Sequence, residues 1–596
     1  MTIPVILVIV PLIVSAFIAL LLRERGTPIK YISLAASLIS SLMIAYIIFT
    51  NVSGGAVQSY PWFNAGFINF QISVATMPLN LLLLGILAVI TPLIFLYSTG
   101  FMQLPSEQSR FYFEMCVFAA AMMLFAISAN FITMFIAWEM LGITSYLLIG
   151  FWYWKEKVPG AARKAITTII IGDILMLIAI LLIGVSYNSF EFSTVLASST
   201  VSPALYVSLV LILIAVFTKS AQFPFHEWLS DAMEGPTPVS GFLHSSTMVK
   251  AGVFLIAVLL PLYVKAGLLS VILVFGIISA ALGASNALTE RHVKKILAYS
   301  TIEDIGLMFI ALGFGSVIAA MMLFLVQAFY KALLFMSAGT MMRANDERED
   351  IYTINGMSTS KTFLIITLIG ALSLAGIFPL SGFFGKGYVE SSISNPLVYA
   401  IVLLIELATS IYIFRWVFLQ SRRPYEQGNT IAMELKATPK SMLAAAAILA
   451  ALVVIGSAAY IYLPGFLGST QTAQIGIEQY ITVNIIALLG LAVAYRVYRQ
   501  GHRLHMASTN RALFSLLYNS PAVNKAYLYI AKGVSAIGSG LGRFDLGFDK
   551  VTYSAAGFTI GSGDSIKKVV DGQTNVYVFA FIVGVILLVF AYVIYL

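Results

Sequence analysis

Long apolar segments separated by short polar stretches run through most of the chain. Each continuous run is close to the length of about 20 residues that a helix needs to cross a bilayer. A transmembrane barrel would instead show short segments that alternate between apolar and polar residues. The pattern predicts sixteen membrane helices, near residues 3–22, 30–50, 78–98, 111–127, 130–150, 164–186, 204–224, 239–262, 268–288, 294–314, 316–341, 361–391, 396–418, 442–464, 479–498 and 575–595.

The composition supports this pattern. Hydrophobic residues make up 60% of the 596 residues, whereas charged residues make up only 10%. A soluble domain could not bury so much apolar surface, so the sequence predicts an all-α polytopic membrane protein. The first apolar run, Ile3 to Leu22, has no basic segment before it and no small-residue cleavage site after it. We therefore interpret it as a retained helix and not as a signal peptide.

The connections between the predicted helices differ in their content of Lys and Arg. The odd-numbered connections carry most of these residues, whereas the even-numbered ones are nearly free of them, with Lys265 as the exception. By the positive-inside rule, the odd-numbered connections lie in the cytoplasm and the N-terminus lies outside. One miscounted helix would scramble this alternation, so the alternation supports the predicted number.

Two of the predicted helices are interrupted. The stretch Phe217–Pro238 contains Pro224 and two further prolines after the seventh helix, and Gly376–Glu390 places glycines and Pro379 inside the twelfth. Paired interrupted helices in corresponding positions of two halves indicate an inverted repeat with sites near the midplane of the membrane. Five helices separate the two interruptions, and an odd offset inverts the topology. The sequence therefore predicts an inverted repeat of two five-helix bundles with broken helices seven and twelve.

The predicted helices divide the chain into six parts. These are helices one to three (1–110), the first half of the repeat (111–262), the second half (263–420), helices fourteen and fifteen (421–498), a lateral segment (499–574) and a C-terminal anchor (575–596). The lateral segment mixes apolar residues with spaced charges, which is typical of an amphipathic helix that lies on a surface. Its glycines, including Gly538, Gly540 and Gly542, favour the alternative of a cytoplasmic loop with two short helices.

Several ionisable residues lie inside the apolar runs, where each costs about 2.5–3.5 kcal/mol even on lenient insertion scales. Four of them are far from any connection and are interpreted as parts of an ion path: Glu139, Lys219, Lys331 and Lys386. For four others, an internal salt bridge or a side chain that reaches the interface is an equally good interpretation: Lys164, Glu303, Glu406 and Arg415.

This mixture of residue types is suited to proton transfer. A lysine that is stripped of water can give up its proton reversibly, and a nearby carboxylate opposes that loss. We therefore expect Glu139 to pair with Lys219, so that separation of the pair releases a proton. Histidine ordinarily titrates near neutrality, which suits His244 as a relay towards Lys331 and a terminal group at Lys386.

Motifs around these residues resemble a known family. They are AWEMLGITSYLLIGFW around Glu139, KA…GD from Lys164 to Asp173, FPFHEWLSDAMEGPTPVSGFLHSSTMVKAG in the interrupted stretch, KKILAYSTIEDIGLM and FYKALLFMSAG. They resemble the antiporter-like subunits of respiratory complex I and the related Mrp cation/proton antiporters, most strongly over residues 75–390. The length, Lys386 and the lateral segment indicate the L-type subunit, the counterpart of mitochondrial NADH dehydrogenase subunit 5.

The resemblance implies roles for individual residues. Proton-translocation roles are implied for Glu139, Lys219, His244, Lys331 and Lys386, and supporting roles for Asp173, Lys164, Lys250 and Asp304. The chain also departs from the family pattern. Gln327 and Leu323 replace the usual histidines before Lys331, and Gly387 replaces an acid after Lys386. Asp304 replaces a neutral residue, and we expect it to modulate Lys331 or Lys386.

The implied function is that of a proton-translocating membrane subunit of a complex I-like oxidoreductase, as part of a translocase. The single cysteine, Cys116, and scattered histidines offer no cluster or zinc site, and no dinucleotide fingerprint or Walker loop is present. We therefore expect no cofactor in this chain and expect iron–sulfur clusters, flavin and quinone only in partner subunits. Other membrane-arm subunits and the bilayer of a prokaryotic plasma membrane are the expected partners. The net charge of +8 does not indicate nucleic-acid binding, because the placement of basic residues dominates in membrane proteins.

Two alternatives remain at this point. One is an Mrp-type Na⁺/H⁺ antiporter subunit or a related subunit of a bicarbonate-uptake complex. The other is a structural clamp with an inactive channel. The sequence leaves open the electron donor, the choice between H⁺ and Na⁺, and whether Gln327 and Gly387 mark a partly degenerate path.

Overall fold

The computed structural model describes residues 4–22, 27–51, 55–65, 68–422, 435, 437–468 and 475–499. All of them fall within one compact unit, Met1–Tyr518. The predicted lateral segment after residue 499 and the predicted sixteenth helix lie outside the described residues.

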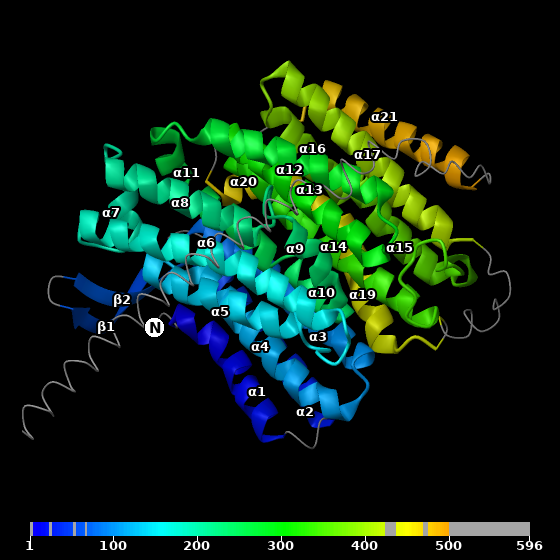
Figure 1. Ribbon diagram of the computed structural model, residues 1–596, viewed down its shortest axis with the longest axis horizontal. Helices are drawn as coiled ribbons and strands as arrows, with labels where there is room; N and C mark the ends of the chain where they lie inside the picture. Colours follow the sequence, from blue (N-terminus) through cyan, green and yellow to red (C-terminus); the bar gives the residue numbers. More distant parts are fainter. Residues whose placement is uncertain are drawn as a thin grey trace, which may run out of the picture. The chain divides into compact units, whose positions relative to one another are not determined.

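The described part of the chain consists mostly of helices (Figure 1). Those before residue 266 are η1 (Val5–Ile9), α1 (Val10–Leu21), α2 (Thr27–Asn51), α3 (Pro78–Phe101), α4 (Pro105–Ile127), α5 (Phe131–Ile149), α6 (Val158–Tyr187), α7 (Phe192–Leu196), α8 (Pro203–Lys219), α9 (Glu227–Asp231), η2 (Ala232–Glu234), α10 (Thr237–Leu243) and α11 (Met248–Lys265). Those that follow are α12 (Leu269–Thr289), α13 (Val293–Gly313), α14 (Val317–Ala344), η3 (Met357–Thr359), α15 (Lys361–Leu374), α16 (Ser381–Ser392), α17 (Pro396–Gln420), α19 (Lys440–Ile455), η4 (Gly456–Ala458), α20 (Ala459–Phe466), α21 (Ile477–Ala494) and the π-helical turn η5 (Tyr495–Arg499).

The predicted membrane helices are found in their predicted places. Twelve helical spans of the described chain are long and apolar enough to cross a membrane. Three shorter apolar helices, Val5–Leu21, Pro203–Lys219 and Lys361–Leu374, bring the total to fifteen. These fifteen correspond one for one to the first fifteen predicted segments. The prediction of a helical polytopic membrane protein is therefore confirmed over the described residues, with one β-hairpin as the exception.

The uncharged connection between α2 and α3 forms a β-hairpin that the sequence analysis did not predict. Strands β1 (Val57–Ala65) and β2 (Ile68–Ala75) pair in antiparallel fashion, with Val57 opposite Ala75 (Figure 1). The Ser73 hydroxyl donates to Glu191 Oε1 over 2.7 Å, just before α7. This hydrogen bond ties the hairpin to the connection between α6 and α8.

Both predicted interruptions are present. Helix α8 ends at Lys219 and the chain is non-helical up to α9, while α15 ends at Leu374 and α16 begins at Ser381. Each interruption contains a cis Phe–Pro peptide bond, at Pro224 and at Pro379. The two lysines occupy different places, because Lys219 closes the helix before its break whereas Lys386 lies inside the helix after its break.

The predicted eighth helix is also broken, and its prediction as one continuous helix was wrong. The stretch His244–Thr247 separates α10 from α11. Hydroxyl groups in this stretch bond to nearby carbonyl groups, from Ser245 to Gly241 and from Thr247 to Phe242. Such local bonds compete with the helical pattern and permit a break without a proline.

Helix α13 packs closely against α12 and is buried inside the protein. A Cβ atom added at Gly283 would lie 2.6 Å from the backbone nitrogen of Glu303, and one added at Gly306 would lie 2.6 Å from that of Ala280. Small residues at such crossings let helix backbones approach closely. Residues Val293 to Leu312 of α13 are nearly all buried, including Glu303 and Asp304.

Candidate ion path through the membrane interior

The first cluster of the path is built around Lys219 at the end of α8. Its fully buried ammonium group donates to the Trp138 carbonyl over 2.6 Å, and it lies 3.5 Å from Asp173 Oδ1. The same nitrogen stands 4.2 Å from the centre of the Trp138 ring, within the range of a cation–π contact. Trp138 in turn donates its indole N–H to Asp173 Oδ1 over 2.6 Å. Three helices, α5, α6 and α8, thus hold one buried lysine–aspartate pair.

Glu139 does not form the predicted direct pair with Lys219. The carboxylate that pairs with Lys219 is Asp173, which was predicted only as a supporting residue. Glu139 is half-buried, and its Oε1 atom is buried without a hydrogen-bond partner in the protein. One helical turn after Glu139, a Cβ atom at Gly142 would lie 3.6 Å from both Asp173 Oδ2 and Lys219 Nζ. Because residues three apart share a helix face, Glu139 borders the Lys219–Asp173 pair from α5.

Lys164 stands apart from this cluster. Its ammonium group lies 2.8 Å from Asp231 Oδ2 and 3.7 Å from Glu227 Oε2, and all three side chains are partly exposed. Lys164 therefore ties the beginning of α6 to α9, the short helix after the break. The structure does not bring it to Asp173 or to Lys219.

Two fully buried residues of the broken eighth span lie against α14. His244 is in the break, with its ring centre 6.1 Å from that of Phe335, and its Nδ1 atom has no partner in the protein. Lys250, in the first turn of α11, donates to the Phe324 carbonyl over 2.7 Å. Phe324 and Phe335 are about three helical turns apart on α14, and Lys331 lies between them in the sequence.

The second cluster is built around Lys331 on α14. Its ammonium group lies 3.1 Å from Asp304 Oδ2 and donates to the Ser300 hydroxyl, and both charged side chains are fully buried. The Tyr330 hydroxyl donates to Asp304 Oδ2 over 3.2 Å. Asp304 was expected to modulate Lys331 or Lys386, and in the structure it forms an ion pair with Lys331. One turn before Lys331, the polar side-chain atoms of Gln327 are buried without a protein partner.

Lys386 ends the row of predicted residues. Its side chain is fully buried on α16, and its Nζ atom has no hydrogen-bond partner in the protein. A Cβ atom at Gly376, which has a positive φ of 80°, would lie 3.2 Å from Lys386 Cδ. A Cβ atom at Gly387 would lie 2.9 Å from Ile475 Cδ1. This close contact leaves little room for an acidic side chain directly after Lys386, which explains one departure from the family pattern.

The structure also separates the residues for which the sequence left two interpretations. Arg415 is buried and donates to the carbonyls of Ala287, Leu288 and Glu290 over 2.5–3.1 Å, so it caps the end of α12. Glu303 is fully buried, and its carboxylate accepts from the Thr409 hydroxyl and from the Tyr412 hydroxyl at 2.9 Å. Glu406 is buried on α17, and its carboxyl group contacts that of Glu390.

Glu390 was missed by the sequence analysis. It lies four residues after Lys386 on α16 and is almost completely buried. The spacing of four, which puts two side chains on one face of a helix, was the signal that could have found it. It was missed because Glu390 stands near the end of its apolar run, where an acid usually reaches the solvent.

An ion pair outside the spans joins the start of α13 to the following connection. His292 Nε2 lies 3.0 Å from Glu349 Oε2. The hydrogen bond from His292 lowers the pKa of Glu349 from 4.5 to about 2, while partial burial opposes this shift. Within the described residues, no group of three or more His, Cys, Asp or Glu side chains could hold a metal ion.

Comparisons with known proteins identify a consistent set of relatives. The family profile described as "NADH:quinone oxidoreductase/Mrp antiporter, TM" matches residues 128–412. NADH-quinone oxidoreductase subunit L of Buchnera aphidicola is 35% identical over 433 residues, which cover 69% of this chain and 70% of that protein. F(420)H(2) dehydrogenase subunit L of Methanosarcina mazei is 29% identical over 654 residues, covering 97% and 95% of the two chains. NAD(P)H-quinone oxidoreductase subunit 5 of Paulinella chromatophora is 35% identical over 66% of this chain. The chain spans 63% of that relative's length, and 59% and 60% of two further subunit 5 chains.

Two solved structures have the same fold. The Mrp complex from Dietzia sp. aligns with a TM-score of 0.77 and 23% identity, over 99% of this chain and 63% of that chain. The archaeal membrane-bound sulfane sulfur reductase aligns with a TM-score of 0.68 and 19% identity, over 82% of this chain and 99% of that chain. At these identities the alignments establish the fold alone.

Proposed function

The chain belongs to the family of NADH-quinone oxidoreductase subunit L, also named subunit 5, and from this premise we propose that it conducts protons across a membrane as one subunit of a complex I-like assembly. The observation that carries the proposal is the row of buried ionisable side chains across the two halves of the protein. Two of its lysines form buried pairs with aspartates, Lys219 with Asp173 and Lys331 with Asp304.

The two pairs are suited to storing and releasing protons. A buried ion pair keeps its charge only while both partners are present, because each charge alone carries a desolvation penalty of several kcal/mol. When a lysine ammonium gives its proton away, the neutral amine no longer balances the aspartate. A change in charge at one pair therefore alters the electrostatic energy of the ionisable groups around it. The loss of a proton at one pair in this way favours proton transfer at the next ionisable group of the path.

The order along the path follows from the helices that carry each residue. Protons enter beside Glu139 and reach the Lys219–Asp173 pair. They continue past His244 and Lys250 to the Lys331–Asp304 pair, and end at Lys386. Water carries them between these groups, because His244 Nδ1 and the polar atoms of Gln327 are buried without protein partners and such groups ordinarily bind water. Asp173, Lys250 and Asp304 support the charges of the path, whereas Lys164 stabilises α9.

The assembly supplies the energy. We infer that redox centres, including iron–sulfur clusters, flavin and quinone, belong to other subunits, and that this chain moves protons in response to quinone reduction there. Its partners are other antiporter-like and membrane-arm subunits in a prokaryotic plasma membrane. We propose that the odd-numbered connections lie in the cytoplasm and the N-terminus outside, and the charge asymmetry of the connections supports this orientation. Residues 111–262 and 263–420 act as the two inverted halves.

The function can be tested with the whole complex in sealed vesicles, by following donor oxidation and internal pH together. We expect Lys219→Met to abolish most of the proton transport, because it removes the charge at the first pair. The matched control is Lys265→Met, since Lys265 is exposed and donates to the Ser198 carbonyl at the outer end of α11. Normal transport by the Lys219 variant would refute the proposed path and favour a structural clamp.

The second candidate is an Mrp-type antiporter subunit, which exchanges sodium for protons. The observation that favours it is the alignment with the Mrp complex over 99% of this chain. Varying sodium in the same vesicles separates the two functions. Proton transport that needs donor oxidation and ignores sodium supports the complex I-like subunit, whereas proton movement driven by a sodium gradient without a donor supports the antiporter.

A further inference from the structure

We propose that Glu390 and Glu406 form a carboxyl pair that receives protons from Lys386 and releases them on the face of the even-numbered connections. This inference rests on the proposed function, because it names the exit of the same path. The two buried acids have no role in the proposed path up to Lys386. The contacts that support their role involve α16, α17 and α21.

Lys386 and Glu390 face the same way. They are four residues apart on α16, and residues at this spacing lie one above the other on a helix. Lys386 is fully buried without a hydrogen-bond partner for its ammonium group, and Glu390 is 1% exposed. An unpartnered buried ammonium group next to a buried carboxyl group is a donor placed beside an acceptor.

Glu390 and Glu406 share a proton. Their carboxyl groups are in hydrogen-bonding contact, and neither forms an ion pair with a cation anywhere in the described chain. Two ionised carboxylates cannot remain in contact in a buried place, so one of the two is protonated and donates to the other. The Oε1 atoms of both residues are buried without a protein donor, which leaves the pair able to accept a further proton.

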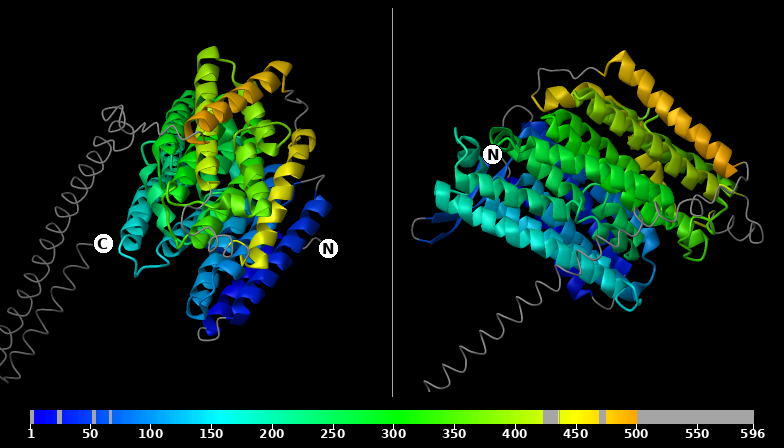
Figure 2. Two further views of the ribbon diagram at one scale, coloured as in Figure 1. Left: turned by 90° about the vertical axis from the view of Figure 1, so that its right-hand side faces the viewer. Right: turned by 45° about the horizontal axis from the view of Figure 1, so that its top comes forward.

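A hydroxyl chain leads from the pair towards the surface. The Tyr399 hydroxyl lies 3.2 Å from Glu390 Oε2 and 3.1 Å from the Thr482 hydroxyl. Tyr399 and Thr482 are both partly exposed. Tyr399 lies in the first turn of α17 and Thr482 in the second turn of α21, and these two helices run side by side (Figure 2). Glu390 itself is in the last turn of α16, so the chain of groups ends at even-numbered connections.

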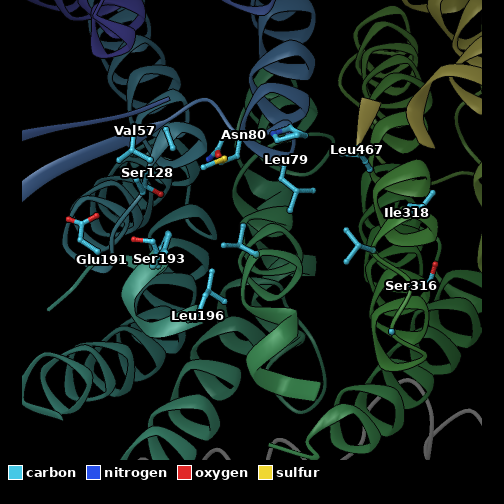
Figure 3. Close-up of a pocket in the computed structure, with 18 of the residues that line it drawn as sticks. Val57, Leu79, Asn80, Ser128, Glu191, Ser193, Leu196, Ser316, Ile318 and Leu467 are labelled. Atoms are coloured by element: carbon cyan, nitrogen blue, oxygen red, sulfur yellow. The ribbon is translucent and has the colours of Figure 1, made fainter. Parts of the chain in front are cut away.

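A cavity is present on the face of the protein that carries the even-numbered connections. This cavity of about 1200 Å³ is lined by Ser391 and Ser392, the two residues that follow Glu390. Its other walls include Asn80, Ser128, Glu191 and Ser316, all at or beside even-numbered connections (Figure 3). Solvent can therefore approach the end of α16 at the place where the proposed exit opens.

The transfer is balanced in protons and charge. An N–H bond of the Lys386 ammonium group breaks as an O–H bond forms on the carboxylate of the pair, leaving a neutral amine and two protonated carboxyl groups. The second proton then passes to water at the end beside Tyr399, which restores the shared-proton state. Lys386 regains its proton from the direction of Lys331.

The test compares Glu390→Gln and Glu406→Gln with Lys386→Met in the whole complex in sealed vesicles. Glu478→Gln is the matched control, because Glu478 is an exposed acid in the first turn of α21 at the same end of the protein. We expect each of the two buried variants to lower proton transport by about a hundredfold, at the low end of what the loss of a positioned proton donor or acceptor costs. The control should transport normally.

Infrared difference spectra provide a readout that a purely structural role would not give. The carbonyl absorption of a protonated carboxyl group that is hydrogen-bonded to a carboxylate should be present in the unmodified complex and should shift in frequency in both single variants, since the remaining acid loses its carboxyl partner. Glu390→Asp, which keeps the acid on a shorter side chain, should restore part of the transport.

The outcomes separate this inference from the proposed function. Loss of transport in Lys386→Met together with normal transport in both Gln variants would overturn the exit through the pair and leave the path intact. Normal transport in all three variants would overturn the path itself. A carboxyl absorption whose frequency is unchanged in Glu406→Gln would also refute the shared proton.

Discussion

Replacing Asp173 by Asn removes one charge from the first cluster and changes its shape very little. The amide oxygen of Asn can still accept the indole N–H of Trp138, which now lies 2.6 Å from Asp173 Oδ1. Lys219 keeps its bond to the Trp138 carbonyl at 2.6 Å. The variant therefore isolates the electrostatic contribution of the aspartate from its contribution to packing.

The size of that contribution follows from the distance between the two charges. Lys219 Nζ and Asp173 Oδ1 are 3.5 Å apart. With an effective dielectric constant of about 20, Coulomb's law gives an attraction of about 5 kcal/mol at this distance. This value agrees with the cost of about 3–5 kcal/mol for leaving one partner of a buried ion pair alone. The energy that keeps a proton on Lys219 falls by a similar amount, so we expect Asp173→Asn to lower proton transport by at least about a hundredfold.

The assay is proton transport per donor oxidised, measured in vesicles that contain the intact complex. The matched control is Asp350→Asn, which makes the same chemical change in an exposed pair with Arg291 at 2.6 Å. Exposed pairs contribute only about 0–1 kcal/mol, so this control should transport normally and remain stable. Transport by Asp173→Asn within twofold of the unmodified complex would refute the argument, because Lys219 would then not depend on Asp173 for its charge.

Three further predictions concern other parts of the structure. Asp304→Asn should lower proton transport strongly, because it removes the counter-charge 3.1 Å from Lys331; unchanged transport would show that Lys331 is held by other groups. Gly172→Ala should lower the free energy of unfolding by about 1–3 kcal/mol through overpacking, since its Cβ would lie 1.9 Å from Thr218 Oγ1 and 3.0 Å from Ala215 Cα. The control in thermal unfolding is Gly160→Ala on the same helix, because a Cβ added at Gly160 would have no atom within 4 Å. The Glu349 pKa is lowered from 4.5 to about 2, so this carboxylate stabilises the fold above pH 4.5 and loses that effect as the pH falls towards 2. Denaturation between these pH values should therefore be less steep for Glu349→Gln, and an identical pH profile would contradict the pairing with His292.

The sequence pattern located the membrane helices well because hydrophobicity alone determines where a helix can cross a bilayer. Fifteen predicted segments correspond to helices of the described chain, and both proline-containing breaks are present. The break at His244–Thr247 was missed because it depends on hydroxyl groups that bond to nearby carbonyls, for which no single residue is diagnostic. The hairpin of β1 and β2 was missed because attention went to the lack of charge in that connection, not to its alternating residues.

The site was predicted as a set of residues but not as a set of contacts. Which carboxylate meets Lys219 depends on how α5 and α6 are rotated about their axes, and hydropathy says nothing about rotation in runs that are apolar on all sides. The side chain of Asp173 points to Lys219, whereas Glu139 stands at the border of the pair. For the same reason Lys164 was grouped with Asp173 in the sequence, although it pairs with Asp231 in the structure.

The two predicted halves of the inverted repeat carry different charges. In the first half, Glu139 and Asp173 accompany a single lysine, Lys219, on helices five, six and seven of the predicted order. In the second half, the helix that corresponds to α6 carries Lys331, so the aspartate that pairs with it comes from α13. Lys386, on the counterpart of the seventh helix, is then left without an aspartate of its own.

Lys219 and Lys331 each form a buried ion pair with an aspartate, whereas Lys386 has no such pair within the described residues. Glu390, one helical turn after Lys386, contacts Glu406 instead. The two halves therefore differ in how their lysines are balanced by acids, which is why we place the proposed exit at the end of α16.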